Sequence, residues 1–168
     1  MHYNININTK FDLGGDIVEF HVYSRTKAKR ESYKFKKPTI IVSITDPSRD
    51  LNIFAKNPNI IAVCRVQFDD TDEEMFRRGE VLMTKNDAKK IGDFIRAYKN
   101  MAECIIVHCE AGISRSSGVM AAIEKYLTGS DSDIFDNRKF CPNRHCYRLM
   151  INELFEVPEG SAFGEIEQ

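Results

Sequence analysis

The chain has 168 residues, 42% of them hydrophobic and 29% charged, with a formal net charge of −1. This is the size and composition of one globular domain, since domains average about 150 residues. The near-zero charge gives no overall attraction for nucleic acid or for anionic membranes, and no apolar run approaches the about 20 residues that span a bilayer, so we expect neither partner.

Four segments have the composition of β-strands. Residues 16–24 alternate apolar and polar side chains, which is typical of a strand. Residues 38–45 and 59–68 are near-continuous β-branched runs, as expected of strands buried on both faces. The segment 103–109, "ECIIVHC", is another such strand.

Helical patterns alternate with these strands. Residues 84–100 place Ala88, Ile91, Ile95 and Tyr98 on one stripe, behind polar capping residues. A second helix is predicted over 114–127, ended by Thr128-Gly129, and a last helix starts near Pro142-Asn143. The alternation predicts an α/β fold: a single domain with a central mixed or mostly parallel β-sheet flanked by helices.

The chain shows no linker or repeat that would divide it. We expect one domain over residues 1–156 and an acidic, mobile tail over 157–168. The N-terminal "MHYNININTK" has no signal-peptide pattern, and an odd number of scattered cysteines is no disulfide framework. A reduced, cytoplasmic protein is therefore expected, with five cysteines at Cys64, Cys104, Cys109, Cys141 and Cys146.

The stretch "IIVHCEAGISRSSG", residues 105–118, combines a strand, a tight loop and a helix start. That order builds an anion site, because the loop amides and the first helical turn point the same way. Gly112 lets the backbone curl, and Arg115 can grip two phosphate oxygens with its planar fork. Cys109 would lie beneath the phosphorus as a thiolate nucleophile, reachable from solvent, and Ser116 can offer its hydroxyl to the sulfur.

The nine residues "HCEAGISRS" resemble the signature of the cysteine-dependent protein tyrosine phosphatase superfamily, most of all its small dual-specificity branch. The resemblance extends over roughly residues 38–155. It implies phosphomonoester hydrolysis through a phosphocysteine intermediate, with no cofactor and no metal. The catalytic residues would be Cys109, Arg115, Asp70 and Ser116, and the substrate-binding residues Glu110, Ala111, Gly112, Ile113, Ser114 and Arg115.

The general acid of this branch is an aspartate on a loop upstream of the cysteine. Here "VQFDDTDEE" (66–74) follows a strand and offers three candidates. Asp70-Thr71 fits the branch best, Asp72 is second, and Asp69 is third because it is expected to hold the loop. The following "MFRRGEVLMTK" (75–85) is longer than the link typical of small members, so the choice among the three stays open.

The segment "NRKFCPNRHCYRLM" (137–150) resembles the region ahead of the last helix in the same branch. Asn143 can cap that helix and hydrogen-bond near the phosphate loop, or act as a plain cap. A metal site on Cys141, His145 and Cys146 is disfavoured, because adjacent helical side chains point about 100° apart. Cys104 is expected in the core, and His108 is expected to orient the loop.

The expected substrate is a phosphorylated protein, phosphotyrosine first. The absence of tryptophan excludes the tyrosine-specific branch with its Trp-Pro-Asp loop, and Glu110, Ala111 and Ile113 bring no positive charge for polyanionic substrates. Phosphoserine and phosphothreonine depend on pocket depth. The alternatives are an inactive phosphoprotein-binding module and a phosphoinositide or RNA 5′-phosphatase. The basic segment 24–38 either steers phosphopeptides or, as we favour, forms a solvated helix and loop.

Overall fold

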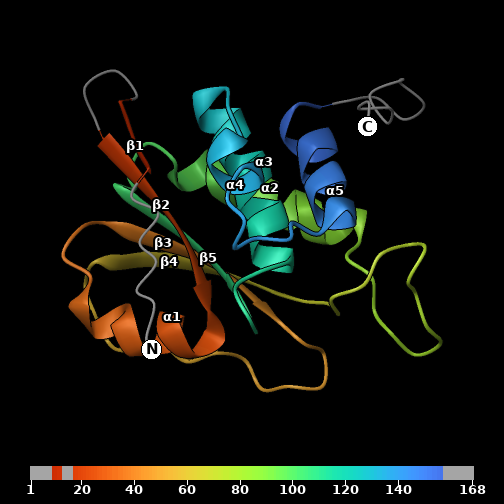
Figure 1. Ribbon diagram of the computed structural model, residues 1–168. Coiled ribbons are helices and arrows are strands. Elements are labelled where there is room, and N and C mark those ends of the chain that lie inside the picture. Colours follow the sequence, from red (N-terminus) through yellow and green to blue (C-terminus); the bar gives the residue numbers. More distant parts are fainter. Residues whose placement is uncertain (1–8, 13–16, 157–168) are drawn as a thin grey trace.

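A five-stranded sheet carries the fold in this computed structural model, which describes residues 9–12 and 17–156 (Figure 1). The strands lie in the order β1-β2-β5-β3-β4; β2, β5, β3 and β4 are parallel, and β1 pairs antiparallel with β2. The predicted mostly parallel sheet is confirmed, and the tail predicted over 157–168 lies outside the described residues. The strands are β1 (Thr9–Asp12), β2 (Ile17–Ser24), β3 (Thr39–Thr45), β4 (Ile60–Gln67) and β5 (Cys104–Cys109).

Burial of the strands follows their place in the sheet. Every residue of β3 and β5 is buried, because these strands have a neighbour on each side and are covered on both faces. The expectation that 59–68 forms a strand buried on both faces is wrong. β4 is the edge strand and most of its residues are partly exposed, with Ile61 38% exposed. A β-branched run thus identified the strand but not its position.

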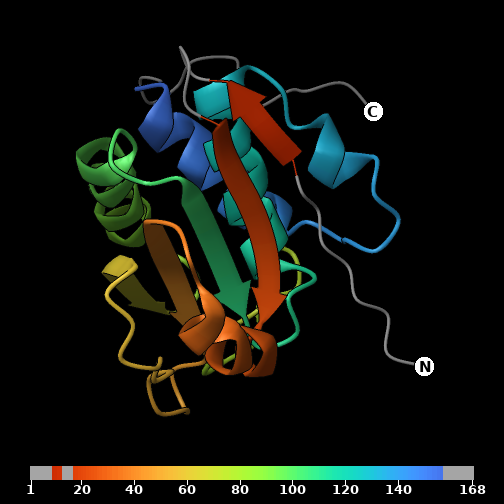
Figure 2. The same cartoon turned by 90° about the vertical axis from the view of Figure 1, so that its left-hand side faces the viewer.

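Helices cover the two faces unequally (Figures 1 and 2). The larger core cluster joins one face to α2, α3 and α5, and the smaller one joins the opposite face to α1. β1 and the one-turn helix α4 were not expected. The helices are α1 (Arg25–Glu31), the 3-10 turn η1 (Ser32–Lys34), α2 (Lys85–Tyr98), α3 (Arg115–Thr128), α4 (Ser132–Phe135) and α5 (Arg144–Leu154). No helix of the described residues is long and apolar enough to cross a membrane.

Local chemistry fixes the helix ends. Thr84 and Asp87 cap α2 reciprocally, each side chain bonding the other's backbone N–H. Gly129 ends α3 at a φ of 86°, in the left-handed region that glycine adopts without strain. The Asn143 side chain accepts a hydrogen bond from the Cys146 N–H and starts α5. Because β3, β4 and β5 are parallel, the loops after them lie at one edge of the sheet, where the strands present their carboxyl ends.

Close backbone contact between α3 and the start of α5 depends on Gly118. A Cβ at this position would lie 2.5 Å from the Asn143 carbonyl oxygen and 3.2 Å from its nitrogen. Both atoms are backbone and cannot turn aside. Gly118→Ala should therefore lower the free energy of unfolding by at least about 1 kcal/mol, as overpacking does, in a denaturant titration.

Gly92→Ala is the matched control, since it is also inside a helix. Its Cβ would meet the Glu153 side chain, 2.7 Å from Cγ, which is flexible and can move away. The helix gains from alanine there, so we expect a smaller loss or a net gain. Equal losses in the two variants would contradict the assigned contact.

Candidate active site

Cys109 ends the central strand β5, and the loop that follows folds over its sulfur. The Gly112 N–H donates to Sγ at 3.3 Å, and Ser116 Oγ lies 3.0 Å from Sγ. Gly112 has a φ of 73°, and a Cβ there would lie 2.5 Å from the Ser24 nitrogen. Glycine is therefore required both for the turn and for the close approach to β2. The result is a sulfur in contact with a backbone amide and a hydroxyl.

The sulfur is less accessible than expected. Cys109 is 1% exposed, because it lies at the end of a strand with neighbours on both sides and the loop closes above it. The expectation of a solvent-reachable thiol is thus wrong.

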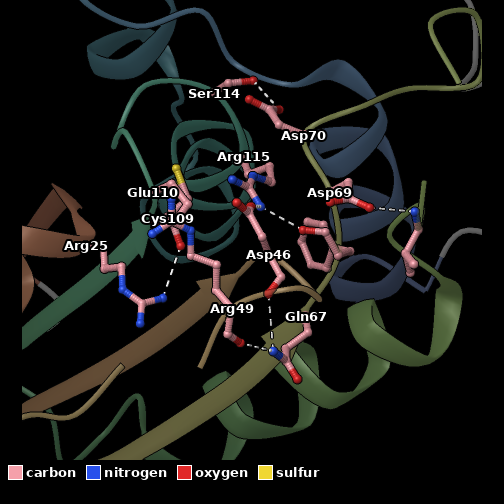
Figure 3. Close-up of polar contacts among 12 residues, drawn as sticks. Arg25, Asp46, Arg49, Gln67, Asp69, Asp70, Cys109, Glu110, Ser114 and Arg115 are labelled. Carbon is pink, nitrogen blue, oxygen red and sulfur yellow. Dashed lines mark hydrogen bonds and ion pairs between the residues drawn. The ribbon is translucent and has the colours of Figure 1, made fainter. Parts of the chain in front are cut away.

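Arg115 is the first residue of α3 and is 4% exposed. Its Nη1 donates to the Phe68 carbonyl oxygen at 2.7 Å and lies 2.6 Å from Asp46 Oδ1 (Figure 3). Its Nε is buried and has no hydrogen-bond partner among the described residues. A buried donor without a partner is costly, so this edge of the guanidinium is suited to an incoming oxyanion.

Asp46 is the residue that sequence reasoning missed. It follows β3 directly, in "TDPSRD", and its carboxylate is the counter-ion of Arg115. The only signal for it was its place after a buried parallel strand, at the same edge as the cysteine loop. That placement gives no hint that it would meet Arg115 and not solvent.

Of the three aspartates after β4, Asp70 reaches residues 110–115, the predicted phosphate loop. Its Oδ1 accepts a hydrogen bond from Ser114 Oγ at 2.8 Å (Figure 3). It also accepts one from Asn143 Nδ2 at 3.1 Å. Asp69 instead accepts from the Val81 N–H at 2.8 Å and closes its own loop. Asp72 accepts from the backbone of Glu74 and Met75. Contact with the loop favours Asp70 as the acid, a role that stays a prediction.

The loop after β4 that carries Asp70, named the acid loop, is connected to α3 by Ser114 and to α5 by Asn143. Ser114 occupies the N-cap position of α3 without capping it, because its hydroxyl donates to Asp70. The first-turn amides of α3 therefore lack a side-chain cap, which suits an anion at this helix end. Asn143 caps α5 and also donates to Asp70 and to the Thr71 carbonyl. It is therefore more than a plain cap, and any direct catalytic duty stays a prediction.

The remaining predicted substrate-binding residues line the turn itself. Glu110 is paired with Arg25 at 3.1 Å and is not free for a ligand (Figure 3). Ala111 and Ile113 are exposed, Ile113 to 45%. The predicted solvated helix and loop over 24–38 is found as α1 and η1, with Arg25 as the basic residue that braces the phosphate loop.

His108 is completely buried beside the nucleophile position. Its Nε2 lies 2.7 Å from Ser43 Oγ, and its Nδ1 lies 3.4 Å from the Cys109 carbonyl oxygen. Burial lowers the pKa of His108 to about 4, so the ring is neutral near pH 7. A neutral, enclosed ring orients the end of β5 and is poorly placed to exchange protons with a substrate.

Comparisons with known proteins identify the fold. No family model and no curated protein matches the sequence. Among solved structures, human DUSP28 aligns with a TM-score of 0.56 at 14% identity, over 82% of this chain and 92% of that one. DUSP15 gives 0.54 at 22%, over 84% and 94%. A human tyrosine phosphatase-like serine/threonine/tyrosine-interacting protein gives 0.55 at 18%, over 82% and 89%. The chain has the fold of the dual-specificity phosphatase-like proteins, as the motif predicted.

Substitution of Asp46 tests whether its carboxylate balances the charge of the Arg115 guanidinium. Asp46→Asn keeps the size but leaves a buried guanidinium without its counter-ion, so the protein should lose about 3 kcal/mol of stability. Tungstate would supply the missing negative charge. We therefore expect it to raise the melting temperature more in Asp46→Asn than in the parent protein, measured by thermal unfolding.

Asp50→Asn is the control, because it makes the same charge change in the same loop. It should leave both the melting temperature and the tungstate shift unchanged. A tungstate shift in Asp46→Asn no larger than the parent's would mean that Asp46 orients the guanidinium without balancing its charge.

Proposed function

We propose that this protein hydrolyses phosphomonoesters, with phosphotyrosine in proteins as the preferred substrate, through a phosphocysteine intermediate. One observation carries the proposal: a loop amide and the Ser116 hydroxyl both contact Cys109 Sγ, within a turn that ends at Arg115. Donors aimed at a sulfur stabilise its thiolate, and the same turn can cradle the phosphate that this thiolate attacks.

In the first step Cys109 Sγ attacks phosphorus and forms an S–P bond while the P–O bond to the leaving group breaks. Arg115, through its unpaired Nε, and the loop amides neutralise the equatorial oxygens. Asp70 gives its proton to the leaving oxygen. Because Ser114 and Asn143 hold one carboxylate oxygen, the other is free to carry this proton.

In the second step Asp70 takes a proton from water, and the water oxygen attacks phosphorus. The S–P bond breaks and inorganic phosphate leaves. Ser116 donates to the departing sulfur, from which it lies 3.0 Å in the resting protein. No redox partner or metal takes part in these two steps.

The surroundings of the loop support a protein substrate. The carboxylate at Glu110 is balanced by Arg25, so the loop adds no excess positive charge to bind further phosphates. Exposed Ile113 offers apolar contact to an aromatic ring or to the flanking peptide. All five cysteines are unpaired, which agrees with a cytoplasmic enzyme whose chemistry needs a reduced thiol.

Cys109→Ser is the direct test of this function. The variant should lose hydrolysis of a phenyl phosphate ester while it still binds vanadate, since the hydroxyl is a poor nucleophile and the cradle remains. In the parent protein, vanadate should also block alkylation of Cys109 by iodoacetate, followed by mass spectrometry. Full activity of Cys109→Ser, or a thiol that iodoacetate never reaches, would end the proposal.

A substrate panel separates the alternatives. The parent protein should hydrolyse a phosphotyrosine peptide faster than an inositol phospholipid or a 5′-triphosphorylated RNA. A faster rate on either of the latter would reassign the substrate. Binding of the phosphopeptide with no turnover of any of the three would identify a binding module.

Asp70→Asn tests the acid. The amide cannot give a proton to the leaving group, so turnover of an alkyl or phenyl ester should fall about 10²-fold or more. An ester whose leaving group needs no proton, such as a dinitrophenyl phosphate, should be affected much less. Asp72→Asn is the matched control and should stay near the parent. The reverse pattern would make Asp72 the acid.

A further inference from the structure

A second cluster of reactive side chains lies at the other end of the sheet. Glu19 and His21 are two residues apart on β2, and Cys104 starts β5 directly opposite Glu19 in the register. Their ligand atoms all lie within 4.8 Å of one another, and no other three-residue group of this kind occurs in the part of the chain that the structure describes. Alternation along a strand places Glu19 and His21 on one face of the sheet.

These donors match the preferences of zinc. A thiolate, an imidazole nitrogen and a carboxylate oxygen bind zinc at about 2.0–2.3 Å, so tetrahedral ligands lie about 3.3–3.8 Å apart. Side-chain shifts of about 1 Å would bring the three atoms to that spacing. Magnesium and calcium prefer all-oxygen sites and would be poorly bound by sulfur and nitrogen.

The buried, unpartnered nitrogen of His21 points to a ligand. The residue is 7% exposed, and its Nδ1 is buried without a hydrogen-bond partner among the described residues. Its Nε2 faces the Glu19 carboxylate at 3.6 Å. A buried imidazole nitrogen without a hydrogen-bond partner is a cost that the described residues do not explain.

Glu19 is already oriented for such a role. Its Oε1 is held by Lys37 Nζ at 2.7 Å, while Oε2 faces His21. Carboxylates that bind metals are usually fixed by a further hydrogen bond, and Lys37 supplies one here. The Lys37 side chain is 43% exposed, so water screens its charge.

A cavity of about 250 Å³ gives access to the cluster. Glu19, His21 and Cys104 line it together with Thr39, Phe35 and neighbouring lysines. It leaves space for a water molecule as the fourth ligand. One thiolate and one carboxylate would balance the charge of Zn²⁺, and the Cys104 proton would pass to solvent.

We propose that Glu19, His21 and Cys104 form a zinc-binding site. Cys104 and Cys109 are five positions apart on β5, about 17 Å along the strand. The bound ion therefore acts on stability, by joining β2 to β5, and takes no part in the chemistry at Cys109. The proposal is independent of the function proposed above.

The test uses cobalt as a probe in a parent protein with Cys109→Ser and Cys141→Ser, which removes the phosphate-loop thiol and the exposed thiol. Cobalt(II) bound by thiolate gives a charge-transfer absorption, and zinc should displace it at one equivalent. His21→Gln and Cys104→Ser should each weaken binding at least tenfold, and Cys104→Ser should also abolish the absorption. Cys64→Ser removes a buried thiol outside the cluster and should leave both the cobalt affinity and the charge-transfer absorption unchanged.

Two measurements need no change in the cluster. Zinc should raise the melting temperature of the parent, and X-ray absorption at the zinc edge should show one sulfur at about 2.3 Å with nitrogen and oxygen ligands. A zinc shell without sulfur, no binding by the parent, or equal binding by Cys104→Ser would overturn the proposal.

Discussion

The candidate site depends on a cation that is almost completely buried. A guanidinium removed from water needs a counter-ion and hydrogen-bond acceptors, and Arg115 finds them on two loops that leave neighbouring strands. Asp46 follows β3 and Phe68 follows β4, and both contact the same Nη1. The charge at the start of α3 therefore draws the loops after three strands together (Figure 3). The phosphate loop, the acid loop and the Asp46 loop are one electrostatic unit.

This unit explains why the acid loop meets the phosphate loop. Arg115 holds the beginning of the loop through Phe68, and Asp70, two residues later, is held by Ser114 and Asn143. Cys109 and Asp70, the two catalytic candidates, are thus positioned by contacts within the chain itself. The turn at Gly112 is needed for this arrangement, since the loop has no room for a side chain against β2.

Much of this arrangement could be predicted from the sequence, because local patterns determine it. The buried runs of β3 and β5, the capped helices and the strand-loop-helix order around Cys109 are local features, and the structure has them. The burial of β4 could not be predicted, because a β-branched run does not say whether a strand has one neighbour or two. Asp46 could not be predicted either, since its partner lies 69 positions away and only the sheet order brings the two together. The periodicity of apolar residues identifies single strands and helices, but it does not say which strands lie next to each other in the sheet.

The two ends of β5 place two buried thiols in different surroundings. At its start, burial and then the Glu19 carboxylate raise the pKa of Cys104 to about 12, so this sulfur keeps its proton until a cation displaces it. At its end, a loop amide and a hydroxyl are directed at Cys109. Both residues are almost fully buried, so exposure does not distinguish them. What differs is the sign of the neighbouring charges and dipoles: a carboxylate beside one sulfur, and donors, a helix N-terminus and a guanidinium near the other. The two proposed roles, a metal ligand at Cys104 and a nucleophile at Cys109, rest on this difference.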